Sequence, residues 1–539
     1  MTTRRTAQLF LIIFSFVFCQ CGLQQPFDSL SSTTIDQGSV GYEVPVGSAI
    51  EKLSISNGGV SIDFENTDSE GQNDAVLIIY ANDISANGTF FKLHPKNLEG
   101  TSYLTKESSE VAKQSFESGE LTFDDYLREF EESIDEDAEL PELDETAQLQ
   151  YLSKGSSRRF NVINTFSASS YETIEATLRY ENEFVKMYVD QRDDDSFSDD
   201  ELATLAENFS ELIAVECELF GDASDVNDDG KIAALFSRVV NKIGASQGGI
   251  VTGYFYAPDL MSKKKYPSSN EMEIIHSLVP DPEGAFGVPV SKSFALNSII
   301  PGVLPHELQH MINFNQHYFV SAVAPEQGWL NEALSHFAED LITVNDDGVI
   351  EGYGTENPAR VADYLSGINQ ICFTCGTSLS QRGGAYLFLK YLYSQAEKGS
   401  LPAVKDGYEL LQKLVQTKKV GVNNVITTAL GASATEDDFK ELLGLFALSV
   451  YFTDSGIAGA DSYNILGMTL RGAAEDYRGT YLQGPAMLDM DSPSYQAYLA
   501  QTGLLFLQIP RYLIEESEHQ FRLSFNQSAD KVGVYLIQP

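Results

Sequence analysis

Histidine, cysteine, tryptophan and positive charge are all scarce in this chain. Its 539 residues include seven histidines, five cysteines and one tryptophan, and 35 lysines and arginines are set against 78 aspartates and glutamates. The formal net charge is therefore −43. A polyanion of this kind repels phosphate backbones, so we expect no nucleic-acid partner. The excess of acid favours solubility and sites for cations.

The apolar run near the N-terminus, LFLIIFSFVF at residues 9–18, is too short to span a bilayer. It follows the basic residues Arg4 and Arg5 and precedes Cys21. This arrangement resembles a bacterial lipoprotein signal, in which the cysteine becomes the lipidated first residue. We therefore predict a signal peptide at 1–21 and an extracytoplasmic protein anchored to the membrane through Cys21. An ordinary cleaved signal peptide, which gives a secreted protein, is the alternative.

Beyond that segment, Cys372 and Cys375 form a close pair in the sequence CFTC. A structural zinc site needs four ligands, which usually come from two such pairs, and no second pair follows. In an oxidising compartment we expect a local disulfide here. A redox role is the alternative, although no thioredoxin-like pattern surrounds the pair.

Hydrophobic patterning divides the rest of the chain. Hydrophobic residues make up 43% of it and aromatic residues 11%, which is enough for packed cores. Alternating stretches such as VSIDF and FRLSFNQ predict β-strands near both ends, and the pattern after His306 is helical, so we expect an α+β fold. The predicted parts are a β-rich domain at 22–104, an acidic linker or exposed helix at 105–157, a central domain at 158–455 and a β-rich accessory domain at 456–539.

Three of the seven histidines lie within the short stretch PHELQHMINFNQH. His306, Glu307 and His310 form the pattern H-E-x-x-H. Residues four apart share one face of an α-helix, so both imidazoles can reach one zinc ion. Glu307 lies beside the first histidine and can take a proton from a zinc-activated water.

The third ligand decides the class of zinc site. A metzincin pattern requires glycine and histidine where this chain has Asn313 and Gln316, so that class is excluded. The segment GWLNEALSHFAED offers Glu332 on a following helix instead. We expect Trp329 and Leu330 to pack this helix onto the first one. The alternative for Glu332 is an acid that faces solvent.

The combination HELQH…WLNEALSHFAED resembles the gluzincin zinc peptidases, with the hyicolysin-type neutral metallopeptidases as the closest likeness. The resemblance covers roughly residues 158 to 450 and implies a thermolysin-like catalytic domain flanked by small β-rich domains. It also implies that His306, His310 and Glu332 bind Zn²⁺ and that Glu307 is the general base.

Two details of the family pattern need assignment in this chain. Thermolysin-like enzymes often place an aspartate four residues after the glutamate ligand to orient the first histidine, and here His336 stands at that position. The family also uses a downstream tyrosine or histidine to stabilise the oxyanion. Tyr386 is our candidate, with Tyr391 and His336 as alternatives.

The sequence DVNDDGKI offers a second metal candidate. Asp225, Asn227, Asp229 and Gly230 match the first half of an EF-hand loop, but Phe236 stands where the bidentate glutamate is required. A complete EF-hand is therefore excluded. A partial Ca²⁺ site and a simple turn before a strand both remain open.

These observations predict an exported zinc-dependent endopeptidase that hydrolyses protein or peptide substrates. The alternative is a surface binding or adhesion lipoprotein on a peptidase-like scaffold, in which the β-rich flanks carry the function. The intact motif favours the enzyme, because a scaffold without activity is free to lose Glu307.

Overall fold

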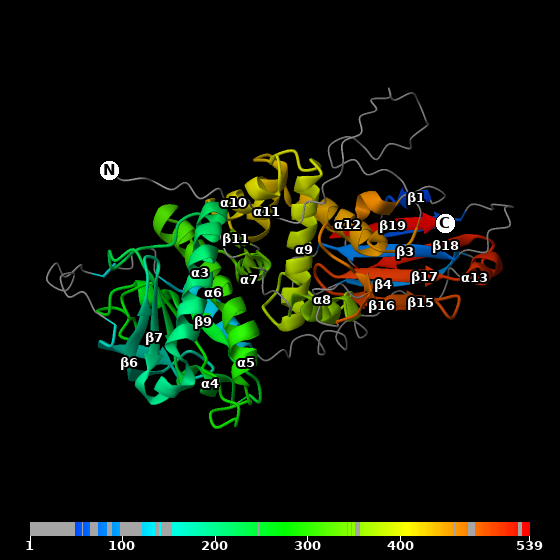
Figure 1. Ribbon diagram of the computed structural model, residues 1–539. Coiled ribbons are helices and arrows are strands. Elements are labelled where there is room, and N and C mark those ends of the chain that lie inside the picture. Colours follow the sequence, from blue (N-terminus) through cyan, green and yellow to red (C-terminus); the bar gives the residue numbers. More distant parts are fainter. Residues whose placement is uncertain are drawn as a thin grey trace.

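The computed structural model has an α+β fold in which three parts follow one another: a sheet lobe, a helical lobe and a β-sandwich (Figure 1). The predicted signal peptide and Cys21 lie outside the described residues. None of the described helices combines the length and hydropathy that crossing a bilayer requires. The described residues are 49–56, 58–64, 74–82, 89–96, 121–134, 140–141, 154–245, 247–341, 343–345, 348–350, 356–457, 460–472, 480–526 and 531–538.

The sheet lobe is built on a six-stranded sheet in the order β5-β6-β7-β8-β10-β9. The β7–β8 and β8–β10 pairs are parallel and the other pairs are antiparallel, so β9 is an antiparallel edge strand. Its strands are β5 (Ser157–Ile163), β6 (Tyr171–Glu181), β7 (Val185–Asp190), β8 (Ile232–Phe236), β9 (Gly253–Phe255) and β10 (Ile274–Ser277).

Helix α6 (Ile300–Phe314) is the central helix of the molecule, and all of its residues are buried. A helix that is apolar or buried all round belongs inside a protein. It continues at both ends into π-helical turns, η4 (Ala295–Ile299) and η5 (Asn315–Val320). The other helical elements of this lobe are η2 (Gln191–Ser196), α3 (Asp199–Phe220), α4 (Arg238–Ala245), η3 (Ala257–Leu260) and α5 (Lys292–Phe294).

The edge strand β9 lies directly against α6 because Gly253 has no side chain. A Cβ atom at Gly253 would stand 2.4 Å from Cγ1 of Val303 on α6 and 2.7 Å from the carbonyl oxygen of His276. Any larger residue would force the helix and the strand apart. The absence of a side chain at one position thus sets the distance between the sheet and the helix that carries the H-E-x-x-H motif.

The helical lobe follows α6, as the sequence pattern predicts. Helix α7 packs beside α6 and α9, and α8 packs beside α9. The disulfide expected between Cys372 and Cys375 is present in the loop before α9. The elements of this lobe are α7 (Gly328–Glu339), β11 (Thr343–Asn345), β12 (Gly348–Ile350), α8 (Asn357–Ser366), α9 (Leu379–Glu397), α10 (Gly407–Val415), α11 (Gly421–Leu430) and α12 (Glu436–Phe452).

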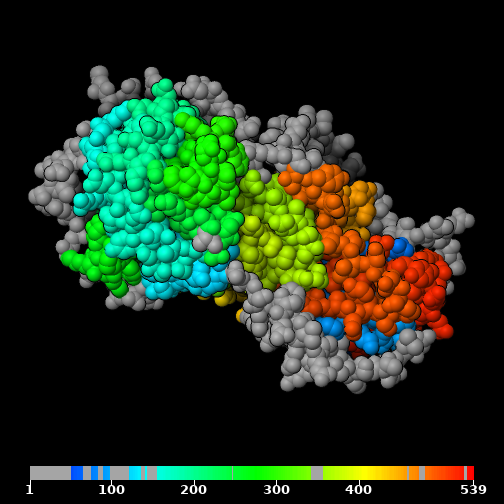
Figure 2. All heavy atoms as spheres, turned by 90° about the horizontal axis from the view of Figure 1, so that it is seen from below, coloured from blue at the N-terminus to red at the C-terminus, as the bar shows by residue number. Residues whose placement is uncertain are grey.

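Both ends of the described chain contribute to one β-sandwich, whereas the sequence suggests separate β-rich domains at 22–104 and 456–539. Its sheets have the orders β1-β19-β3-β17-β15 and β16-β4-β18-β2, so strands from the two ends alternate except at the β17–β15 pair. In Figure 2, N-terminal atoms in blue lie among C-terminal atoms in orange and red. A few strands alone would be marginally stable, and pairing with the other end completes the sheets.

Within the residues that the structure describes, the β-sandwich consists of nine strands, with four short elements beside it. The strands of the sandwich are β1 (Ala49–Lys52), β2 (Gly59–Asp63), β3 (Ala75–Ala81), β4 (Thr89–Pro95), β15 (Met487–Asp489), β16 (Tyr495–Leu499), β17 (Leu504–Ile509), β18 (Gln520–Phe525) and β19 (Val532–Gln538). Beside them lie η6 (Ala460–Tyr463), β13 (Arg471–Gly472), β14 (Leu482–Gln483) and α13 (Arg511–Glu516).

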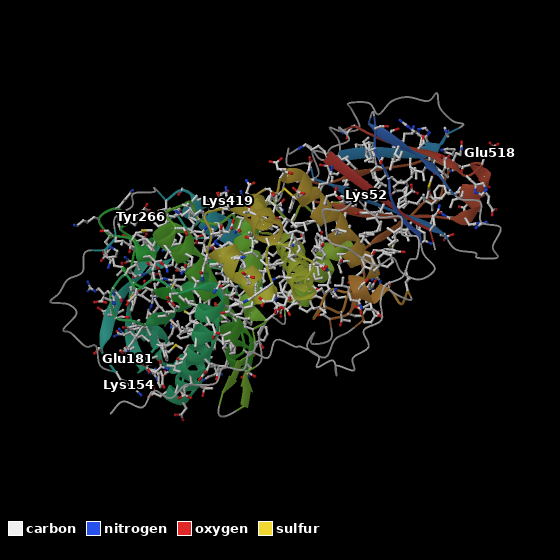
Figure 3. All side chains as sticks on the ribbon, turned by 90° about the horizontal axis from the view of Figure 1, so that it is seen from above. Lys52, Lys154, Glu181, Tyr266, Lys419 and Glu518 are labelled. Carbon is white, nitrogen blue, oxygen red and sulfur yellow. A yellow bond between two sulfur atoms is a disulfide. The ribbon has the colours of Figure 1, made fainter. Side chains whose placement is uncertain are left out.

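Strand β3 explains how the sandwich is attached. Leu77 and Ile79 belong to the core between the two sheets, whereas Ile78 and Tyr80 belong to the core shared with the helices. Alternate side chains of a strand point to opposite faces, so a strand buried on both faces is continuously apolar. Helix α12 covers the outer face, and Lys52, which is labelled in Figure 3, forms an ion pair with Glu441 of this helix.

The segment predicted as an acidic linker contains a helix with one buried side. Helix α2 (Phe123–Glu132) begins with a capping box between Thr122 and Asp125. Its buried residues are Phe123, Leu127, Arg128 and Glu131. The acidic composition indicates solvation, but the apolar and charged residues of this face pack against the rest of the protein.

Candidate metal centre

Helices α6 and α7 bring together the three predicted zinc ligands. The Nε2 atoms of His306 and His310 are 3.1 Å apart, and each is 3.5 Å from a carboxylate oxygen of Glu332. One ligand atom from each residue lies within 4.8 Å of the others, and all three side chains are buried. The one-turn spacing on α6 therefore produces the arrangement that the sequence predicts.

Trp329 anchors the start of α7, as the sequence predicts. Trp329 and Leu330 are buried, and the indole Nε1 of Trp329 donates to Oε1 of Gln327. The ring of Trp329 also contacts the ring of Phe373 edge-on. Since Glu332 follows Trp329 by three residues, this anchor determines where the carboxylate enters the centre.

Hydrogen bonds on the far side of each imidazole fix its orientation. Nδ1 of His306 is 2.7 Å from Oε1 of Glu339, and Nδ1 of His310 is 3.0 Å from Oδ1 of Asn331. Asn313 also donates to that Asn331 oxygen, which is therefore an acceptor. Both Nδ1 atoms then carry hydrogen, so both Nε2 atoms face Glu332 and offer their lone pairs to a metal ion once the rings are neutral. This is the tautomer that a metal ligand needs.

Glu339 is the orienting carboxylate that the sequence analysis leaves unassigned. His336, which occupies the expected aspartate position, donates through Nδ1 to the same Glu339 oxygen at 2.7 Å. The carboxylate is thus shared by two imidazoles and also lies 3.9 Å from Arg360. The spacing could have revealed it, because Glu339 follows Glu332 by two helical turns and shares its face.

Glu332 carries a negative charge although it is buried. Burial opposes ionisation, but Arg382, at 3.1 Å from Oε2, and the nearby His310 hold the pKa of Glu332 well below its usual value. Its other oxygen contacts lead to the Nε2 atoms of His306 and His310, each at 3.5 Å. A buried, ionised carboxylate that faces two imidazole nitrogens is suited to a cation.

Glu307 lies beside the ligands, in contact with the edge strand. Its Oε2 accepts a hydrogen bond of 2.8 Å from the backbone N–H of Phe255 in β9. Burial raises the pKa of Glu307 to about 7, although the neighbouring His306 opposes the shift. A carboxyl group with this pKa can both accept and release a proton near neutral pH.

These residues fit a metal ion. Two imidazole nitrogens, both oriented by hydrogen bonds, and an ionised carboxylate form a donor set that suits a divalent metal ion. A second buried group, His306, His336 and Glu339, has the required spacing too, but it shares His306 with the first. The described structure thus contains a buried His/Glu group that could bind a metal ion.

The three candidates for oxyanion stabilisation lie in different places. The hydroxyl of Tyr386 donates to Asp340, and its role at the oxyanion stays a prediction. Tyr391 is buried beside the rings of Phe388 and Phe446. Nε2 of His336 lies 4.0 Å from Oε2 of Glu332. The sequence pattern of an amphipathic helix does not reveal which aromatic residue faces the centre.

The loop with the calcium-like pattern is a turn held by its own backbone. Oδ1 of Asp225 accepts from the N–H groups of Asp229 and Gly230, and Oδ1 of Asn227 accepts from Asp229 N–H as well. The Asp229 carboxylate forms an ion pair of 2.7 Å with Lys186. These contacts favour the turn over the partial Ca²⁺ site, because a lysine at this carboxylate repels a cation.

No protein-family model matches this chain, and no curated protein matches it.

Proposed function

We propose that this protein is an exported zinc-dependent endopeptidase of the gluzincin type, with a thermolysin-like catalytic domain formed by the sheet lobe and the helical lobe. The observation that carries the proposal is the buried His306–His310–Glu332 group with Glu307 beside it. Protein or peptide chains are the substrates, and the N-terminal signal with Cys21 supports a membrane-anchored location outside the cytoplasm.

His306, His310 and Glu332 would hold the zinc ion. When bound there, zinc supplies Lewis acidity toward a peptide carbonyl and lowers the pKa of water. Glu307 takes a proton from the attacking water and passes it to the leaving amine. Its raised pKa suits both transfers, since the same carboxyl group first accepts the proton and then donates it.

The supporting residues have separate tasks in this scheme. Glu339 and Asn331 hold the two imidazoles with their Nε2 lone pairs inward. Arg382 keeps Glu332 ionised, so that the carboxylate stays available to a cation. The charge on Arg382 also balances part of the negative charge that two glutamates bring into a buried site.

Hydrolysis of an unstructured protein such as casein tests the proposal. Zinc-loaded wild type should cleave it, a chelator should stop the cleavage, and added zinc should restore it. Glu307→Gln keeps the shape of the side chain and removes the basic oxygen, so turnover should fall by at least about 100-fold while zinc stays bound. A Glu307→Gln protein that cleaves at the wild-type rate would rule out the proposed role of this residue.

A further inference from the structure

Helix α2 packs beside α7, the helix that carries the proposed ligand Glu332, although it comes from the acidic segment far away in the sequence. On one side, Phe123 contacts the ring of Tyr254 in β9 at 5.5 Å, and Phe130 contacts Tyr256 at 5.7 Å. Phe130 also reaches Tyr266, which is labelled in Figure 3 on the sheet lobe. The apolar residues of α2 therefore rest on the sheet lobe beside the edge strand.

The acidic start of α2 contacts the helical lobe instead. Asp124 forms an ion pair with Arg382, the residue that also holds Glu332. Asp125 accepts hydrogen bonds from the backbone N–H of Thr377, at 3.0 Å, and from its hydroxyl. Helix α2 thus connects the two lobes on either side of the metal centre.

The buried face of α2 carries two charges into this region. Arg128 and Glu131 are only 4% and 2% exposed and form an ion pair of 2.9 Å. Burial, together with the charges of Glu332 and Glu307, raises the pKa of Glu131 to about 8. A Cβ atom at Gly328, the first residue of α7, would stand 3.3 Å from Cγ of Arg128. The buried pair of α2 therefore lies against the helix that carries Glu332.

With α2 in place, the proposed catalytic residues are closed to solvent. His306 and Glu307 are 7% and 6% exposed, and His310 and Glu332 are 2% and 1% exposed. A peptide bond can be hydrolysed only if it contacts the ligands and Glu307 together. A protein substrate can make that contact only in the fraction of molecules in which α2 has left this position, so wild type should be slow rather than inactive.

We propose that α2 is an inhibitory segment of the same chain, seated where the substrate chain must bind, and that it has to leave before the enzyme acts. The inference rests on the proposed function, because it takes the metal centre as the site of reaction. Arg382 binds the carboxylate of Asp124 and Thr377 binds that of Asp125, so together they form a recognition surface for acidic side chains. The aromatic residues of the sheet lobe supply the apolar part of the same surface.

Two substitutions loosen α2 from opposite sides without altering a proposed ligand or its direct partners. Phe130→Ala removes the contact with the sheet lobe, and Asp125→Asn weakens the contact with Thr377. Glu129→Gln is the matched control, since it makes a similar charge change at an exposed position of the same helix. Because the two substitutions act at different places, a folding defect in one leaves the other informative.

Accessibility of the centre is measured first, in metal-free protein, as the rate at which diethyl pyrocarbonate modifies the peptide containing His306 and His310. We expect about a tenfold or greater increase in Phe130→Ala and Asp125→Asn, because weaker docking raises the open population. The partly exposed His94 in the sandwich and the buried His317 are internal references that should not change. Wild-type rates in both variants, or an equal increase in Glu129→Gln, would overturn the inference.

Casein hydrolysis by the same zinc-loaded proteins is the second measurement. The inference predicts faster turnover in both loosened variants than in wild type and Glu129→Gln. Faster modification without hydrolysis in any variant would mean that α2 does shield the metal centre but that the protein is not a peptidase. Faster modification together with unchanged, measurable hydrolysis would contradict inhibition by α2. The two proposals can therefore fail separately.

Discussion

Replacing Glu339 tests whether residues that hydrogen-bond to the proposed ligands, without binding the metal themselves, strengthen metal binding. This carboxylate is not a proposed ligand, yet one of its oxygens accepts from Nδ1 of both His306 and His336 at 2.7 Å. Glu339→Gln keeps an oxygen that can accept both hydrogen bonds and removes the charge. Glu339→Ala removes the acceptor as well and leaves Arg360, 3.9 Å away, without this carboxylate. The two variants therefore separate the effect of charge from that of orientation.

The expected magnitude follows from the role of such partners. Loss of a carboxylate behind a metal-bound histidine typically lowers metal affinity by about 10- to 100-fold. This corresponds to about 1.4–2.7 kcal/mol. We expect Glu339→Gln near the lower limit, because the geometry is retained, and Glu339→Ala near or beyond the upper limit. Competition with a chromophoric chelator, after full equilibration, gives the zinc dissociation constants.

Asp363→Asn is the control for this series, since Asp363 is an exposed acid on the neighbouring α8. It should bind zinc as tightly as wild type. If Glu339→Ala bound zinc with wild-type affinity while remaining folded, the carboxylate would have no part in organising the site. The orientation of His306 that is inferred from its hydrogen bond to Glu339 would then not contribute to zinc binding.

Three further predictions concern positions outside the ligand set. Tyr386→Phe removes a hydrogen bond to Asp340, so it should lower stability by about 0.5–1.5 kcal/mol in denaturant titration; if the hydroxyl also stabilises the oxyanion, zinc-dependent turnover of the folded protein should fall as well, and unchanged turnover would rule out that role. Wild type should show no rise in melting temperature at millimolar calcium; a rise that Asp225→Ala with Asp229→Ala abolished would restore the calcium site. Cys21→Ala should move the protein from the membrane fraction to the soluble exported fraction, and unchanged partitioning would contradict the lipid anchor.

Local spacing is what made the centre predictable. His306 and His310 are one helical turn apart, and Glu332 stands at the same side of the next helix, so pattern alone brings them together. The α+β class follows from the periodicity of the apolar residues in the same way. The same spacing argument applies to Glu339, which lies two helical turns after Glu332. The neighbouring Asp340 makes this end of the helix look like an exposed acidic surface, so the sequence does not single out Glu339.

Contacts between distant segments could not be predicted in this way. No local pattern indicates that β3 pairs with β17 and β19, because strand pairing depends on which edges meet in the folded chain. Charge density likewise indicated an exposed α2, while its buried residues pack near the metal centre. Tyr386 shows the same limit, since the helix pattern does not specify which neighbour a buried aromatic residue meets.

The metal content of three purified proteins tests the central claim most directly, because it requires no substrate and no turnover. After incubation with zinc and removal of the excess, wild type and Glu307→Gln should each hold close to one zinc ion per chain. Glu332→Ala should hold almost none, because two imidazoles remain without the carboxylate. Equal zinc in Glu332→Ala and wild type, or no zinc in wild type, would contradict a metal centre built from His306, His310 and Glu332.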